Sequence, residues 1–181
     1  ALVLALGLCS VSWAADGEAT VSSKEELEQA LNGSSVTTIK LGADITASIT
    51  IASGKTITLD LNGHKLTNTD GQHTITNNGT LTITGTGTVD NVSHARAALF
   101  NNEGATAVLN GGSFTRSQEN GKTKEDSGNN SFYTIQNLGT MTINAGVSVT
   151  QNGCFSSMVA NGYYNGTGKT NTPTMIINGG T

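Results

Sequence analysis

The sequence predicts an all-β protein that is built from one repeated coil and preceded by a short helix. Of its 181 residues, only 12% are charged and 4% are aromatic, whereas there are 23 glycines and a single proline. Ordinary globular domains have about 25% charged residues. The apolar residues are mostly isolated Ile, Leu and Val between Thr, Asn and Gly, which is typical of short strands. In addition, an apolar residue followed by Asn-Gly or a similar pair recurs every 20 to 34 residues, which indicates an internal repeat.

The first segment, residues 1–14, has the features of a secretory signal. Its apolar stretch ALVLALGLCSV is shorter than the roughly 20 residues that a membrane-spanning helix needs. Ser12-Trp13-Ala14 then provides small residues at the two positions that a signal peptidase reads, which places cleavage after Ala14. The alternatives are a lipoprotein acylated at Cys9 and a buried N-terminal strand. We expect residues 1–14 to be a signal remnant and the protein to be extracellular or displayed at the cell surface, without spanning the membrane.

Residues 15–35 are expected to form a linker and one amphipathic helix. In VSSKEELEQALNG, Ser22 or Ser23 can cap the helix, the glutamates three residues later can complete a capping box, and Gly33 stands where the helix would end. The apolar positions that share one face of this helix are Leu27, Ala30 and Leu31. One short helix before an all-β region is expected to cover the N-terminal end of the sheets.

Residues 36–181 contain two sets of repeated segments. The first set is marked by an apolar residue before the recurring pair, at Leu41, Leu61, Ile83, Leu109, Ile143 and Ile177. In the second set an apolar stretch ends with Asn, as in Ile75-Thr76-Asn77, Leu99-Phe100-Asn101, Ile135-Gln136-Asn137 and Val159-Ala160-Asn161. Two polar, Gly-rich stretches, residues 116–131 and 162–173, interrupt the spacing, and we interpret them as loops inserted into a coil of about 22 to 24 residues.

A repeat of this length with short strands and no helix favours a parallel β-helix. Each coil contributes one strand to each of several parallel sheets, and inward Ile, Leu and Val side chains stack into a continuous core. Asparagines at the same corner of successive coils would form ladders of side-chain amides. The sequence predicts one ladder of Asn62, Asn110, Asn144 and Asn178 and a second ladder of Asn77, Asn101, Asn137 and Asn161.

The stretch LDLNGHKL, residues 59–66, leaves a local alternative open. Asn-Gly between two stretches of alternating apolar and polar residues is also the usual signal of a tight β-hairpin. A hairpin would make the sheet antiparallel, as in a β-sandwich, but it would leave the two regular spacings unexplained. We therefore interpret Asn62-Gly63 as a corner that recurs from coil to coil.

The segments ELEQAL, KTITLDLNGHKL and NNGTLTI together resemble the pectate-lyase-like right-handed parallel β-helix of exported, adhesin-like surface proteins of gut Firmicutes. The resemblance covers nearly all of the chain after residue 14. It implies a right-handed coil, an N-terminal capping helix and a place on or outside the cell. It implies no activity, because the same coil carries polysaccharide lyases, hydrolases, phage tailspikes and adhesins.

Catalytic candidates are few. On this scaffold, lyases combine acids that hold Ca²⁺ with a base, and hydrolases use close carboxylates. The best cluster here is Asp90, His94 and Arg96 in VDNVSHARAAL. These residues could abstract a proton from an acidic sugar, or they could equally form a turn before the next strand. No histidine pair has the spacing of metal ligands, so no metal or other cofactor is predicted, except Ca²⁺ if the protein is a lyase.

The remaining titratable residues fit structural roles. Asp44 aligns with His64 one coil later, and Asp60 aligns with Lys40 one coil earlier, so each fits a charge pair between neighbouring strands. His73 lies among Thr, Asn and Gly, where an exposed polar corner is the usual explanation. These residues therefore do not add to the catalytic candidates.

The inserted stretch GYYNGTGKTNTP favours carbohydrate binding. Tyr163 and Tyr164 can stack on sugar rings, with Asn165 and Lys169 as hydrogen-bonding partners, although one tyrosine could instead cover the edge of the coil. The net charge of -4 and the scarcity of Lys and Arg give no basic face for nucleic acid. The sequence therefore predicts a non-catalytic structural and adhesive module that binds carbohydrate or a host surface. The alternative is a fragment of a polysaccharide lyase or glycoside hydrolase.

The final residues, MIINGGT, stop inside a repeat. The last coil would then have an unpaired sheet edge, which natural solenoids cover. We expect the β-helix to be truncated at this end, with further coils of the same longer chain to follow. We also expect the segment on its own to oligomerise or aggregate through this edge.

Overall fold

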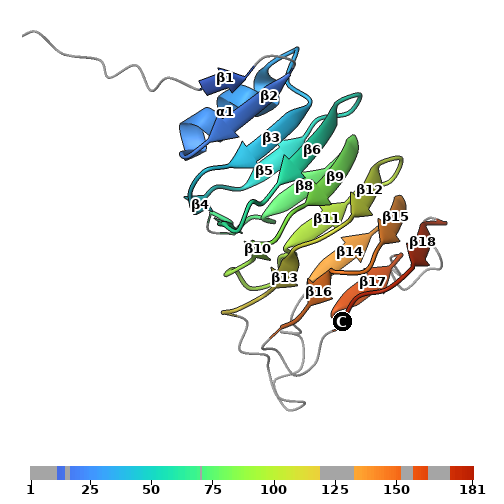
Figure 1. The fold of residues 1–181 in the computed structure, drawn as a ribbon. Helices are drawn as coiled ribbons and strands as arrows, with labels where there is room; N and C mark the ends of the chain where they lie inside the picture. Colours follow the sequence, from blue (N-terminus) through green and yellow to red (C-terminus); the bar gives the residue numbers. More distant parts are fainter. Residues whose placement is uncertain (1–11, 15–16, 70, 119–132, 152–156, 163–171) are drawn as a thin grey trace, which may run out of the picture.

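The computed structural model describes residues 12–14, 17–69, 71–118, 133–151, 157–162 and 172–181. This part of the chain is mostly β, with three parallel sheets and one helix (Figure 1). Among its strand pairs only β1 and β2 run antiparallel. The arrangement is compatible with the predicted parallel β-helix, whereas the alternative of an antiparallel sandwich is wrong.

The strands are short and fall into sheets that we name A, B and C. Sheet A contains β1 (Ser12–Ala14), β2 (Glu18–Val21), β3 (Thr38–Leu41), β6 (Thr56–Asp60), β9 (Thr80–Thr84), β12 (Thr106–Leu109), β15 (Thr140–Ile143) and β18 (Thr174–Ile177). Sheet B contains β4 (Ile45–Thr46), β7 (Lys65–Thr67), β10 (Thr88–Asp90), β13 (Ser113–Thr115) and β16 (Ser148–Val149). Sheet C contains β5 (Ile49–Ile51), β8 (Ile75–Asn77), β11 (Leu99–Asn101), β14 (Ile135–Asn137) and β17 (Val159–Asn161).

From β3 onward, the chain visits the three sheets in the same order each time. β3, β4 and β5 lie in sheets A, B and C, and β6, β7 and β8 follow in the same order, as do the later strands. Each strand is hydrogen-bonded to its equivalents in the previous and the next coil, so the coils are stacked along one direction (Figure 1). The described strand edges at the far end belong to β16, β17 and β18.

Buried side chains from the three sheets meet in one core. Alternate residues of each strand point inward because successive side chains face opposite sides of a sheet. The aligned inward columns are Ile39, Leu59, Ile83, Leu109 and Ile143 in sheet A, Ile45, Leu66, Val89, Phe114 and Val149 in sheet B, and Ile49, Ile75, Leu99 and Ile135 in sheet C. Each such side chain contributes about 2 kcal/mol on burial, so the stack itself supplies the stability of the fold.

Helix α1 (Lys24–Asn32) begins and ends close to where the sequence predicts. The Ser23 hydroxyl accepts a hydrogen bond from the Glu26 amide at 3.2 Å, and the Glu26 carboxylate accepts one from the Ser22 amide at 2.7 Å. The first bond satisfies the Glu26 amide, which has no backbone acceptor in the first helical turn, and the second satisfies the Ser22 amide just before the helix. Leu27 and Ala30 are buried, and the helix lies against β2.

The LDLNGHKL stretch forms a corner between two sheets. Asn62 and Gly63 both have positive φ, 47° and 84°, and the His64 amide donates to the Leu61 carbonyl at 2.8 Å. This is the backbone of a tight hairpin turn. However, the strands on either side, β6 and β7, lie in sheets A and B and pair with other coils.

The predicted register of this corner is wrong by two residues. Leu59, and not Leu61, is aligned with Ile83. The error arises because Leu59 and Leu61 both point inward and are both buried, so the period of two fits either choice. As a result, Asn62 lies two positions away from the ladder of Asn110, Asn144 and Asn178. Its side-chain amide instead donates a hydrogen bond to the Leu41 carbonyl at 2.9 Å.

The three residues Ser12–Ala14, which the sequence assigns to a signal remnant, form β1 and pair with β2. This pairing does not test cleavage after Ala14, which stays a prediction. No helix in the described ranges has the length and apolar character needed to cross a membrane. Residues 119–131 of the predicted loop 116–131 and residues 163–171 of the predicted loop 162–173 lie outside the described residues.

Candidate functional site

Variation in chain length between strands is concentrated around sheet C. Every connection from sheet A to sheet B is three or four residues long. By contrast, the intervals from β13 to β14, from β16 to β17 and from β17 to β18 are much longer, and each begins or ends at a strand of sheet C. Because connections carry function more often than the scaffold that holds them, sheet C and its borders form the candidate site.

The outer face of sheet C presents the central residue of each of its strands. This outer row consists of Thr50, Thr76, Phe100, Gln136 and Ala160, which are aligned from coil to coil. Phe100 is partly exposed, whereas Gln136 is 1% exposed. The Gln136 Nε2 atom lies 3.5 Å from the Gly162 carbonyl, at the limit of a hydrogen bond, and the buried Oε1 atom has no hydrogen-bond partner. The row thus combines an aromatic ring with an incompletely satisfied amide.

His73 extends this row at the border between sheets B and C. Its ring is stacked on that of Phe100, with ring centroids 4.6 Å apart and an angle of 20° between the planes. Its Nδ1 atom accepts a hydrogen bond from the Ala97 amide at 2.8 Å, which requires that nitrogen to be unprotonated. The expected exposed corner is therefore wrong for His73, which is partly buried.

Burial, reinforced by the charge of Arg96 and, more weakly, that of Arg116, lowers the pKa of His73 from 6.5 to about 4. In the unfolded chain this histidine takes up its proton at higher pH than in the folded protein. The stability that the neutral ring contributes is therefore complete above pH 6.5 and declines as the pH falls from there towards 4. The loss amounts to at most about 3 kcal/mol.

We expect the ring carbon protons of His73 to titrate in nuclear magnetic resonance spectra with a midpoint near pH 4, because protonation would break the bond to Ala97. The same resonances in urea-unfolded protein should titrate near the ordinary value of about 6.5. A folded-state midpoint at the ordinary value would contradict this assignment.

Asp90, the first of the predicted catalytic residues, is held in an ion pair. Its side chain is 0% exposed, and its Oδ2 atom lies 2.8 Å from the Lys65 ammonium. Ser117 donates to the same carboxylate through its hydroxyl at 2.6 Å and its amide at 3.0 Å. Burial alone would raise the pKa of Asp90, but the hydrogen bonds from Lys65 and Ser117, together with the Lys65 charge, bring it below its usual value.

The other two predicted catalytic residues lie in the turn between β10 and β11. His94 is exposed, and the next residue, Ala95, has a positive φ of 56°. The Arg96 guanidinium donates to the carbonyls of Gly71 at 2.6 Å and Ala95 at 2.9 Å. Arg96 therefore joins the borders of two successive coils, and a catalytic role for these three residues stays a prediction.

The two asparagine ladders differ in their surroundings. Asn77, Asn101 and Asn137 are completely buried, and each donates to the next amide oxygen at 2.7 Å, with Asn161 as the last acceptor. Each also donates to a backbone carbonyl of sheet A in the next coil, at 2.9 to 3.1 Å. In the other ladder, Asn178 donates to Asn144 at 2.8 Å and Asn144 donates to Asn110 at 2.7 Å, but this ladder is exposed.

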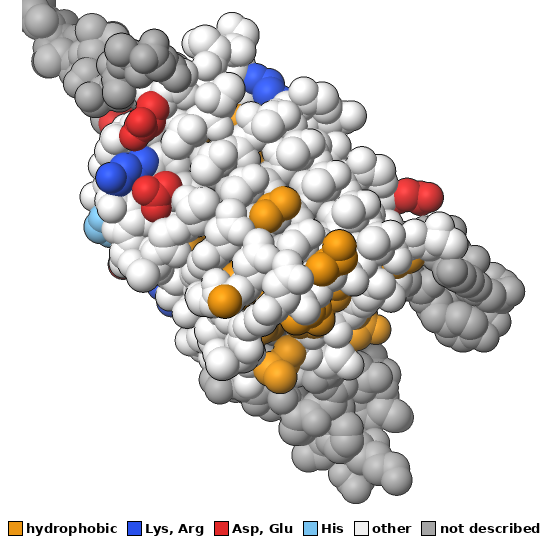
Figure 2. Space-filling model, turned by 45° about the vertical axis from the view of Figure 1, so that its right-hand side comes forward, with side chains coloured by type: hydrophobic (Ala, Val, Ile, Leu, Met, Phe, Trp, Pro, Cys, Tyr) orange, Lys and Arg blue, Asp and Glu red, His pale blue; other side chains and the backbone are white. Residues whose placement is uncertain are grey.

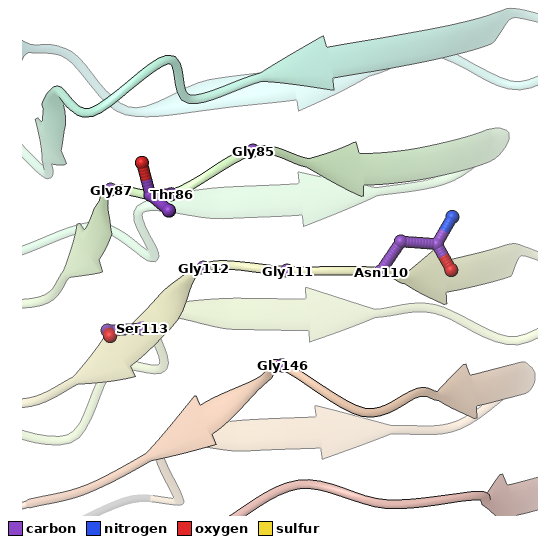
Figure 3. A pocket seen from close by; sticks show the side chains of 8 residues that line it. All are labelled: Gly85, Thr86, Gly87, Asn110, Gly111, Gly112, Ser113 and Gly146. Atoms are coloured by element: carbon purple, nitrogen blue, oxygen red, sulfur yellow. The ribbon is translucent and has the colours of Figure 1, made fainter.

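The corners between sheets A and B enclose a shallow depression of about 340 Å³ (Figure 3). It is lined by Gly85, Thr86, Gly87, Asn110, Gly111, Gly112, Ser113 and Gly146. Packing explains four of these glycines: a Cβ atom on Gly111, for example, would lie 2.6 Å from the Gly85 carbonyl oxygen, whereas one on Gly146 would meet no atom closer than 3.8 Å. The lining contains no charged or aromatic side chain, so the depression is a weaker candidate than the outer row of sheet C.

The two charge pairs predicted across neighbouring coils differ. His64 Nδ1 lies 3.5 Å from Asp44 Oδ1, whereas Lys40 and Asp60 are aligned in neighbouring strands but not within ion-pair distance of each other. The predicted ligand-binding residues Tyr163, Tyr164, Asn165 and Lys169 lie outside the described residues. They follow β17, a strand of sheet C, in the sequence. Comparison with protein-family models, with curated proteins and with solved structures gave no match for this chain.

Proposed function

We propose that the protein is an exported, pectate-lyase-like right-handed parallel β-helix that binds carbohydrate through the outer face of sheet C and acts as an adhesive surface module. Helix α1 then covers the N-terminal end of the coil. The observation that supports this proposal is the position of the long connections, which all border sheet C while the opposite corners stay short.

The chemistry of the outer row suits a sugar. The stacked pair of His73 and Phe100 offers a ring face on which the apolar side of a pyranose can lie. Thr76 and Thr50 lie one and two coils earlier in the same row, and their hydroxyl groups are at least partly exposed and can hydrogen-bond to a sugar. Successive coils repeat at about 4.8 Å, so a chain of sugars laid along the stack would contact several coils at once.

Catalysis is not part of the proposal. Asp90 is fully buried and engaged by Lys65 and Ser117, so its carboxylate is not positioned to contact a polysaccharide. An increase in ultraviolet absorbance from unsaturated products, when the protein is incubated with uronate polysaccharides and Ca²⁺, would support the lyase alternative instead.

The proposal predicts that the full chain is retained by members of a glycan array and that Phe100→Ala weakens the binding of those glycans by roughly tenfold or more, as measured by calorimetry. Val108→Ala is the matched control, since Val108 is a partly exposed apolar residue at an outward position of sheet A. Retention on no glycan would overturn the proposal. An equal loss in the Val108 variant would show that the outer face of sheet C is not the binding surface.

A further inference from the structure

A second depression lies where the outer row of sheet C meets α1. It has a volume of about 220 Å³ and is lined by Glu28, Leu31 and Asn32 of the helix and by Ser48, Ile49 and Thr50 at the start of β5. Thr50 is also the first residue of the outer row, so the row leads directly into this depression. Within the described residues, β5 is the last strand of sheet C at this end. We call this feature the helix depression.

The lining of the helix depression combines an apolar base with polar groups. Ile49 is buried and Leu31 packs against the core, so both supply apolar surface. Glu28, Asn32 and Thr50 are exposed, and their carboxylate, amide and hydroxyl groups supply hydrogen-bond acceptors and donors. A few polar groups around an apolar base are typical of small-molecule sites. The volume lies below the roughly 300 to 1,000 Å³ of clefts for drug-sized ligands, which suits one sugar unit.

Both sides of the helix depression are fixed to the scaffold. The Lys55 ammonium donates to the Gly33 carbonyl at 2.5 Å, which holds the C-terminal end of α1 beside the connection between β5 and β6. The Ser48 hydroxyl accepts hydrogen bonds from the amide and the hydroxyl of Thr69, both at 2.9 Å, which ties the other side to the next coil. A ligand can therefore bind here with little cost for ordering the backbone.

Glu28 is the only charged residue in the lining. Its carboxylate lies 3.7 Å from the Lys24 ammonium, but both side chains are about half exposed, so the pair is weak and the carboxylate can accept further hydrogen bonds. Arg96, the cation that acts on His73, belongs to the coil of β11 and not to that of β5. Sugar hydroxyl groups can therefore donate to Glu28, whereas a sugar carboxylate in the helix depression would be repelled.

Charge is unevenly distributed along the stack. In residues 133–151, 157–162 and 172–181, no Asp, Glu, Lys or Arg occurs. On the face shown in Figure 2, most charged side chains lie on the side of the N-terminal coils. The outer row itself has no charged member. Selection of a ligand by its charge is therefore expected at the N-terminal end of the row, where Glu28 lies.

We propose that the helix depression binds the terminal sugar of a glycan whose chain lies along the outer row, and that it selects a neutral terminal sugar over a uronic acid. This inference rests on the proposed function, because it takes the outer row as the carbohydrate-binding surface. From Phe100 to Thr50 the row advances by two coils, roughly 10 Å, so the sugars that follow a ring stacked on Phe100 reach the depression. The helix lies across the end of the row, so a chain end is bound there and not an internal unit.

The test is calorimetry of the full chain with linear tetrasaccharides of glucose, galactose and mannose, each either neutral or with one terminal unit oxidised at carbon 6 to a uronate. We expect at least one neutral tetrasaccharide to bind roughly tenfold or more tightly than its oxidised counterparts. Glu28→Gln should remove most of this preference, because it removes the charge and keeps the shape. Glu25→Gln is the matched control, since Glu25 is exposed on the same helix but does not line the depression.

A second variant tests the contact itself. Asn32→Ala should weaken the binding of the preferred neutral tetrasaccharide by roughly tenfold, and circular dichroism spectra that match the unaltered chain would show that the variants fold.

The outcomes separate the chain-end site from the binding surface. If Phe100→Ala weakens binding while Glu28→Gln and Asn32→Ala change neither preference nor affinity, the chain-end site is wrong and the proposed function stands. The same holds if an oxidised tetrasaccharide binds most tightly, or if array glycans are retained but no tetrasaccharide binds. Retention of no glycan of any kind would overturn both.

Discussion

Replacing Asn101 with alanine is expected to lower the free energy of unfolding by about 3 kcal/mol, as measured by urea unfolding followed by circular dichroism. The substitution removes the central amide of the buried ladder. It removes one of the two acceptors of the Asn77 amide group, which keeps the Thr106 carbonyl, and one of the two donors to the Asn137 amide oxygen, which keeps the Gly139 amide; Asn77 and Asn137 are both completely buried. A buried polar group that loses its partner costs about 1 to 3 kcal/mol.

The exposed ladder provides the matched control. Asn144 also donates to one asparagine and accepts from another, at 2.7 and 2.8 Å, but its neighbours are in contact with water. Asn144→Ala should therefore lower the stability by less than about 1 kcal/mol. If the two variants were equally destabilised, burial of the amides would not be the reason for the cost.

Replacing Lys65 with methionine is expected to lower the free energy of unfolding by about 2 kcal/mol at neutral pH. The reason is that the buried carboxylate of Asp90 then keeps only the hydrogen bonds from Ser117. The cost is smaller than for a fully buried pair because the Lys65 side chain is 44% exposed. The measurement is urea unfolding of both proteins across a pH series. The exposed pair of Lys24 and Glu28, 3.7 Å apart, supplies the control, and Lys24→Met should have little effect.

The pH series tests the direction of the effect. In the unaltered protein the pKa of Asp90 is below its ordinary value, so the ion pair stabilises the fold above an unfolded-state pKa of about 3.9. This stabilisation is lost as the pH falls through the folded-state pKa. The difference in free energy of unfolding between the unaltered protein and the Lys65→Met variant should therefore become smaller in acid. A difference that stays constant down to low pH would contradict the assignment to Asp90.

The parallel sheets could be predicted because strand alternation and repeat spacing in the sequence point to the same structure. Alternation of Ile or Leu with Thr marks the strands, and the spacing of the Asn-terminated segments matches the alignment of β8, β11, β14 and β17 residue by residue. The slip at Leu61 shows the limit of this reasoning. A period of two cannot distinguish Leu59 from Leu61, and only the hydrogen bonds between coils determine which of them faces Ile83.

The candidate site was less predictable from the sequence. The contact of His73 with Phe100 and that of Lys65 with Asp90 join residues more than twenty positions apart; the first depends on the path of the corner that holds His73, and the second on the register of β7 against β10. A signal was nevertheless present, since each segment that departs from the regular spacing adjoins a strand of sheet C. Insertions indicate where a repeated scaffold carries a functional site, but they do not indicate which side chains come into contact there.

The stacking of strands also determines how the molecule responds to a mechanical load. In a parallel stack the hydrogen bonds between coils run along the direction of stacking. A force that pulls the two ends of the stack apart therefore breaks the hydrogen bonds between one pair of coils at a time. Thr58 and Thr82, which are aligned in adjacent coils, are 24 residues apart. Each coil that detaches would therefore lengthen the molecule by roughly 75 Å, and the protein would extend in steps while the remaining coils stay folded.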